Sequence, residues 1–177
     1  MRIFAAVISL ASVVACASGG ANPSTSGALE TTRITSGSQI ALDNVNDEGR
    51  SKAVANASIA EVWRVLPSVL DSLGVKVATV NSTTYDIGNT GLDVRRQLGS
   101  TMVSKYFDCP AGGAMSLDLF VSVVVHLDPA SPSTTNLLTR LAVKGKPISY
   151  SGGWVNCSST GVLEQRIAEG VNARLGR

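Results

Sequence analysis

The strongest hydrophobic pattern in the chain is an alternation with a period of two between Leu117 and Leu127. Every second residue in this stretch is Leu or Val, and most residues between them are polar or aromatic. A period of two places successive side chains on opposite faces of a β-strand, so one face here is expected to be buried. A turn-rich segment at 128–133 leads to a second alternating stretch at 137–143. The two stretches predict a long antiparallel hairpin.

Hydrophobic residues recur at helical spacing in the segment 59–73, which predicts a helix there. Ser58 and Glu61 form the pattern of a capping box, in which each side chain satisfies a backbone donor at the helix start. Gly74 suits the left-handed backbone position just after the helix. Pro67 lies inside the pattern and is expected to bend or split the helix, because proline has no backbone N–H to donate.

The same spacing predicts a C-terminal helix over residues 162–175, with a hydrophobic residue at every fourth position from Leu163. Ser159 or Thr160 is expected to cap its first turn. Glu164 is among the polar residues expected on its solvent side.

Weaker patterns predict further elements between and after these. Short strands are expected at 75–80 and 85–88, and another at 148–155. Apolar residues four positions apart predict a helix over 94–107, with Asp93 as its N-cap.

This set of elements predicts an α+β fold, in which a mostly antiparallel sheet is covered on one face by helices. The pattern from Val62-Trp63 to Leu73-Gly74, the long hairpin and the C-terminal helix resembles the helix-grip domains of several envelope proteins. These include the lipoprotein subunit of the outer-membrane β-barrel assembly machine, although the present chain carries one such domain rather than two. A ferredoxin-like order of elements with an added C-terminal helix is the alternative.

The N-terminus has the pattern of an export signal. Arg2 provides a short positive region, and residues 3–14 form an uncharged stretch rich in Ala, Val, Ile and Leu. About a dozen apolar residues are too few for a permanent membrane-spanning helix but fit the core of a signal peptide.

The sequence Val13-Val14-Ala15-Cys16 resembles the lipobox of bacterial lipoprotein precursors. The resemblance implies that Cys16 receives a diacylglycerol through its thiol, that cleavage follows Ala15, and that the new amino group takes a fatty acyl chain such as palmitate. Two or more acyl chains make membrane anchoring stable. The alternative is cleavage after Ala17 by ordinary signal peptidase, which would discard the cysteine.

These features divide the chain into three parts. Residues 1–15 are the predicted lipoprotein signal peptide, and residues 16–37, rich in Ser, Gly, Thr and Ala, are a predicted flexible tether. Residues 38–177 are a predicted single α+β domain, and no internal repeat divides it.

The two remaining cysteines, Cys109 and Cys157, suit one disulfide in the oxidising compartment that an export signal implies. The predicted bridge closes a loop of about 49 residues, which corresponds to roughly 4 kcal/mol in the chain-entropy model.

Composition and charge exclude some classes of partner. The formal net charge is +2, so the sequence provides no electrostatic case for binding nucleic acid. Aromatic residues make up only 5% of the chain, so the core must consist mainly of aliphatic side chains.

The sequence predicts no catalytic, metal-binding or cofactor-binding site. His126 is the only histidine, and it lies on the polar side of the alternating strand beside Ser122 and Asp128. Residues four apart along a strand are about 13 Å apart, too far for a proton relay, so we expect a solvated surface histidine. The pair Arg95-Arg96 is expected on a solvated helix face, because neither a glycine loop nor interleaved aromatic residues accompany it.

Of the two tryptophans, Trp63 is expected in the core, and Trp154, after two glycines, is the candidate for a recognition residue. The function expected from the sequence is that of a non-enzymatic envelope protein, lipid-anchored on the outer membrane facing the periplasm, that binds an envelope protein or component. The alternative is a carrier of small apolar ligands, with a cavity between the sheet and the C-terminal helix.

Overall fold

The computed structural model of the 177-residue chain describes residues 31–32, 42–46, 50–110, 112–149 and 152–176. The predicted signal peptide, Cys16 and nearly all of the predicted tether lie outside these residues. Within the tether segment, only Thr31–Thr32 are described, and they form a short strand.

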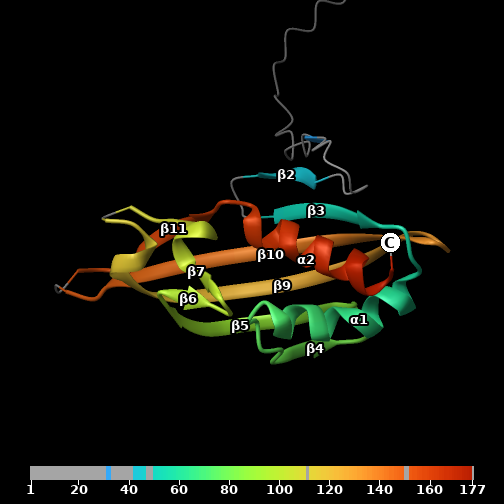
Figure 1. The fold of residues 1–177 in the computed structure, drawn as a ribbon, viewed down its shortest axis with the longest axis horizontal. Coiled ribbons are helices and arrows are strands. Elements are labelled where there is room, and N and C mark those ends of the chain that lie inside the picture. The colour runs from blue at the N-terminus through green and yellow to red at the C-terminus, as the bar shows by residue number, and fades with distance from the viewer. Residues whose placement is uncertain (1–30, 33–41, 47–49, 111, 150–151, 177) are drawn as a thin grey trace, which may run out of the picture.

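The fold is α+β, with a mostly antiparallel sheet and two helices that lie across one of its faces (Figure 1). The helices are α1 (Ile59–Ser72) and α2 (Val162–Arg174), and short 3-10 turns occupy Val103–Lys105 and Ala114–Ser116. The strands are β1 (Thr31–Thr32), β2 (Leu42–Asn46), β3 (Arg50–Ala55), β4 (Thr79–Asn81), β5 (Asp86–Arg95), β6 (Gln97–Leu98), β7 (Thr101–Met102), β8 (Phe107–Asp108), β9 (Leu117–Ser131), β10 (Thr134–Pro147) and β11 (Val155–Ser159).

The strands are ordered β1-β2-β3-β10-β9-β5-β6-β7 across the sheet. In addition, β4 pairs with β5, and β11 pairs with both β10 and β8. Strand β10 therefore has β9 along one side, and β3 and then β11 along the other.

The predicted hairpin is confirmed as β9 and β10, which pair from Leu117 opposite Pro147 to Ser131 opposite Thr134. The strands extend further into the predicted turn than the sequence suggested, and only Pro132 and Ser133 remain between them. The alternating Leu and Val residues of β9 are all at most 2% exposed and face the helices. This face of the hairpin forms the floor of the core.

The first predicted helix is confirmed as α1. Ser58 and Glu61 form both hydrogen bonds of the capping box, and Gly74 adopts the expected positive φ of 85°. Pro67 lies inside α1 without dividing it into two helices. The apolar stripe of the helix packs into the core, where Val62 and Leu66 are fully buried.

The C-terminal helix is confirmed as α2, but neither predicted residue caps it. Gly161 occupies the N-cap position with a φ of 82° and provides no side chain. The Thr160 hydroxyl donates instead to the carbonyl oxygen of Lys105, and the Ser159 hydroxyl accepts from the backbone of Gly161. The helix packs closely on α1, because a Cβ at Gly170 would lie only 2.7 Å from a methyl carbon of Val69.

The helix predicted over 94–107 is wrong, and this segment forms β-structure instead. Val94 and Arg95 end β5 opposite Leu119 and Asp118 of β9, and the chain then turns through β6 and β7 into a 3-10 turn. The supposed apolar stripe does not share one face, since Met102 is 51% exposed. Only Val94 and Arg95 of this segment pair with β9, whereas β6 and β7 pair with each other and β8 pairs with β11. This strand pairing outweighs the helical spacing of the segment. The observed order of elements, with short strands rather than a helix between β5 and β9, differs from the ferredoxin-like alternative.

Three of the weaker predicted strands are present with bounds that differ from the predicted ones. The strand predicted at 75–80 is confined to β4, and the one at 85–88 extends through β5 to Arg95. The strand predicted at 148–155 instead begins at Val155 as β11. Strand β3 was not predicted, because its buried face carries only the small residues Ser51, Ala53 and Ala55.

The space between β9 and the helices is filled by side chains. Val121, Val123 and Val125 of β9 are 0% exposed, as are Ile167 and Val171 of α2. A side chain with no accessible surface has no water-sized space beside it, so none of these residues lines a cavity.

Candidate binding site

The face of the sheet opposite α1 and α2 is here called the open face. The residues of β9 that point to it are exposed or half-buried, namely Asp118, Phe120, Ser122, Val124 and His126. Side chains alternate along a strand, so the period of two that buries the Leu and Val residues of β9 also places these residues on the open face. No helix among the described residues is long and apolar enough to span a membrane.

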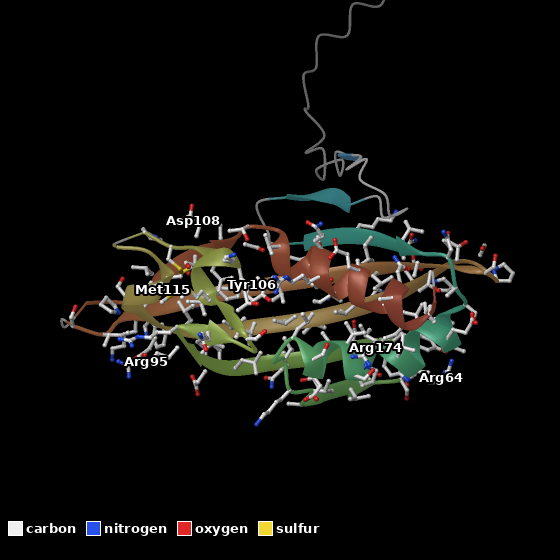
Figure 2. All side chains as sticks on the ribbon, viewed as in Figure 1. Arg64, Arg95, Tyr106, Asp108, Met115 and Arg174 are labelled. Atoms are coloured by element: carbon white, nitrogen blue, oxygen red, sulfur yellow. A yellow bond between two sulfur atoms is a disulfide. The ribbon has the colours of Figure 1, made fainter. Side chains whose placement is uncertain are left out.

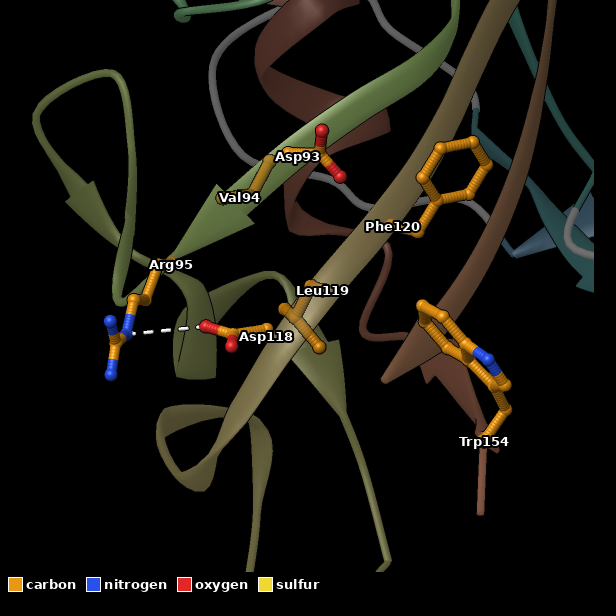
Figure 3. Close-up of a pocket in the computed structure, with 7 residues that line it drawn as sticks. All are labelled: Asp93, Val94, Arg95, Asp118, Leu119, Phe120 and Trp154. Atoms are coloured by element: carbon orange, nitrogen blue, oxygen red, sulfur yellow. Dashed lines mark ion pairs between the residues drawn. The ribbon is translucent and has the colours of Figure 1, made fainter. Parts of the chain in front are cut away.

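A shallow pocket of about 320 Å³ lies at one end of the open face. Residues 93–95 of β5, residues 118–120 of β9 and Trp154 line it, and these residues are here called the Trp154 pocket (Figure 3). In the view of Figure 3, the rings of Phe120 and Trp154 lie on one side of β9, and Arg95 and Asp118 lie on the other.

An irregularity in β5 leaves space for the ring of Phe120 on the open face. The pairing of β5 with β9 shifts between Asn89 and Leu92, so β5 carries one extra residue there. Gly91 lies in this bulge, and a Cβ on it would be 3.6 Å from the Phe120 ring. The ring therefore rests over a residue without a side chain and remains 41% exposed.

Trp154 reaches the pocket from the segment just before β11. In β11, Asn156 pairs with Lys144 of β10, and Trp154 is two residues earlier, so it shares the face of Asn156. Its side chain is 60% exposed. Neither Trp154 nor Phe120 takes part in the aromatic ring pairs that the described residues form. Both rings are therefore partly accessible to a ligand, and the prediction that Trp154 is a recognition residue is compatible with its position.

The disulfide predicted from the sequence is present and supports the strand that follows Trp154. Cys109 and Cys157 are bonded, with their Cα atoms 4.4 Å apart. The bridge joins β11 to the segment just after β8, beside Asp108 in Figure 2. It lies three residues from Trp154 and limits the movement of this end of β11.

Charged groups of both signs lie on the two strands beside Phe120 and across β9 from the rings. Arg95 and Asp118 are cross-strand neighbours, and their side chains form an ion pair at 3.2 Å. Asp93 lies opposite Phe120 on β5, and Lys144 lies opposite Phe120 on β10. The arrangement offers hydrogen-bond acceptors and donors around an aromatic platform.

His126 lies on the open face, but it is half-buried and paired rather than simply solvated. Its Nδ1 is 3.0 Å from Oδ1 of Asp86, the residue directly opposite on β5. The hydrogen bond donated by the Thr84 hydroxyl, together with His126 and the charge of Arg140, lowers the pKa of Asp86 against the opposing effect of desolvation. The partner of His126 is thus a residue on another strand, and the structure does not connect His126 to Ser122.

The structure also places the other residues that the sequence analysis considered, Trp63, Arg95 and Arg96. Trp63 is half-buried against the core, and its ring meets that of Tyr85 edge to face at 5.5 Å. Arg95 and Arg96 are exposed as expected, but they lie at a strand end and a tight turn rather than on a helix. Among the described residues, no group of three or more His, Cys, Asp and Glu side chains could hold a metal ion.

Glu164 is the main polar residue that sequence reasoning misplaced. It was expected on the solvent side of α2, but it is 2% exposed, and neither carboxylate oxygen has a hydrogen-bond partner. Burial raises the pKa of this carboxyl. The Ser159 hydroxyl and the backbone of Glu164 oppose the shift without reaching hydrogen-bonding geometry.

Sequence reasoning also missed Phe120 and Asp93 as parts of a site. Phe120 carried a usable signal, because it is a large aromatic residue on the polar side of an alternating strand. Asp93 carried none, since its place opposite Phe120 depends on the pairing of β5 with β9. A comparison of the chain with models of known protein families and with curated proteins finds no match.

Proposed function

We propose that this chain is an exported, lipid-anchored protein of the bacterial envelope that binds another envelope component without catalysing a reaction. The anchor is Cys16, and the protein is held on the outer membrane facing the periplasm. The Trp154 pocket is the binding site. The observation that carries the proposal is the pair of exposed rings, Phe120 and Trp154, on an otherwise mostly polar sheet face.

The pocket has the composition expected of a recognition site. Aromatic residues are enriched where proteins bind partners, since they contribute a large contact area at low cost in side-chain entropy. Burying the exposed part of a Trp and a Phe in the free protein would be favourable, yet the fold leaves both accessible. A bound component would cover them.

The filled interior favours surface binding over the alternative of a carrier for small apolar ligands. Such a carrier needs a cavity between the sheet and α2, and the side chains that would line it have no accessible surface. Among the described residues, His126 contacts Asp86, and no hydrogen bond joins it to a hydroxyl or thiol that could act as a nucleophile.

Site-specific photo-crosslinking in intact cells tests the proposal. A photoreactive phenylalanine analogue replaces Phe120 in one variant and Val80 in the control. Val80 is 61% exposed on β4 and does not line the Trp154 pocket. We expect a discrete adduct from position 120 and none from position 80. Equal adducts from both positions, or none from either, would show that the open face does not bind a specific component.

A further inference from the structure

The Trp154 pocket carries an inference about the chemistry of its ligand, and this inference rests on the proposed function. We infer that the pocket binds a sugar ring of an envelope glycan, with the ring stacked on Trp154 and its hydroxyl groups bound by the surrounding charged side chains.

A sugar ring has an apolar face and a polar rim. Its axial C–H groups form a surface that packs on an aromatic ring, whereas its hydroxyl groups project outward around the edge. Trp154 and Phe120 offer aromatic faces that no other described ring covers, and both belong to one pocket. An amphipathic ligand that stacks on one of these faces keeps its rim in contact with the polar groups beside it.

The groups at the edge of the pocket match such a rim. The carboxylate of Asp93 accepts hydrogen bonds and forms no ion pair with the part of the chain that the structure describes. Arg95 and Lys144 donate, and Lys144 lies directly across from Phe120. Each sugar hydroxyl both donates and accepts, so neighbouring hydroxyls can use a carboxylate and a cationic group together.

The same charges disfavour other small ligands. Asp118 is already paired with Arg95, which leaves Asp93 as the one uncompensated carboxylate lining the pocket. A cationic ligand would approach Arg95 and Lys144, and an anionic ligand would approach Asp93. A purely apolar ligand would desolvate the charged groups without replacing their hydrogen bonds to water. An uncharged ring with several hydroxyl groups is not repelled by either charge, and its hydroxyls replace the hydrogen bonds to water.

The size of the pocket supports one ring rather than a large ligand. At about 320 Å³ it lies at the small end of the range for ligand pockets. It is also shallow, so a longer glycan can continue out of it across the open face. The expected ligand is therefore a polymer that presents one residue to the pocket.

Calorimetric titration of the full-length protein in detergent with a tetramer of N-acetylglucosamine tests the inference directly. We expect saturable binding, at least about tenfold weaker in Trp154→Ala, and weaker in Asp93→Asn. Met102→Ala is the matched control, because Met102 is 51% exposed outside the pocket and its loss should leave the affinity unchanged. A lysine-rich peptide serves as the cationic competitor. Tighter binding of this peptide than of the tetramer would overturn the assignment to a sugar.

Two further arms identify the source of the glycan. Co-sedimentation with purified peptidoglycan and binding to vesicles that contain lipopolysaccharide are compared for the wild type and Trp154→Ala. Binding in either arm that depends on Trp154 supports the inference and names the source. Absence of Trp154-dependent binding to the tetramer, the peptidoglycan and the vesicles overturns it. If the crosslink from position 120 then still joins a protein, the proposed function survives with a different ligand.

Discussion

Glu164 provides the sharpest test of the energetics of this fold. Its carboxyl is 2% exposed in the first turn of α2, and both oxygens lack a hydrogen-bond partner. A buried polar group without a partner costs about 1–3 kcal/mol, and more when it is charged. Glu164→Met keeps an unbranched side chain of similar length and removes both oxygens. We therefore expect it to raise the free energy of unfolding at neutral pH by about 1–3 kcal/mol.

The pH dependence of the free energy of unfolding separates the cost of burying a charged Glu164 carboxylate from the cost of burying a neutral polar group. The folded-state pKa is raised above the ordinary value of 4.5, so the folded protein holds this proton more tightly than the unfolded chain. Stability from this group is fully present below the unfolded pKa and is lost as the pH rises through the folded pKa. Glu164→Gln cannot ionise, so its advantage over the wild type should be near zero at pH 4 and should grow as the pH rises.

Urea unfolding between pH 4 and pH 8 measures both effects. The expected gain for Glu164→Met corresponds to about 2–4 °C in melting temperature for each kcal/mol. Glu169→Gln is the control for the same change of side chain, because Glu169 is exposed on the same helix. A wild type that is more stable than both Glu164 variants at pH 8 would refute the reasoning, since it would mean that the buried carboxylate has a favourable partner.

Four further predictions concern the anchor, the bridge and the core. The protein should partition into the detergent phase, and Cys16→Ser should abolish this; a mature N-terminus at Ser18 found by mass spectrometry would contradict lipidation. Cys157→Ser should lower the free energy of unfolding by roughly 2–5 kcal/mol, and unchanged thermal unfolding would contradict a stabilising bridge. Val123→Asp should prevent stable folding by burying an unpaired charge, whereas Ser122→Asp on the open face should fold, as circular dichroism would report. Gly170→Val should cost about 1–3 kcal/mol in urea unfolding, because a Cβ there meets Val69; wild-type stability would show that the two helices can separate freely.

The parts of the fold that sequence predicted are those whose pattern is long and local. The hairpin repeats its alternation over many residues, and α1 combines a broad apolar stripe with a capping box. Strand β3 escaped prediction because the residues it buries are small, which gives almost no hydrophobic signal. Their size has a structural reason, since α2 packs against β3 and needs a flat surface there.

The failures arise where distant pairing decides the local structure. Segment 94–107 has helical spacing, but its first two residues pair with β9, and later residues form short strands that pair with one another or with β11. Glu164 looked like an ordinary surface residue because its neighbours Gln165 and Arg166 are polar. The candidate site could be predicted only in part for the same reason. Trp154 was identifiable because two glycines precede it, whereas the approach of Asp93 and Phe120 follows from strand order.

If the chain is exported as proposed, the position of β10 between its three neighbours determines when the sheet can form during that export. Ala53 of β3 pairs with Leu137 of β10, about 84 positions later in the chain. Strand β5 also needs β9, and β11 needs β10, so no large part of the sheet can be completed while the chain is still emerging from a membrane pore. Such nonlocal pairing slows folding. Such a chain stays unfolded, and can pass through a membrane pore, until the last third of it has emerged. Only then can the sheet assemble around β10.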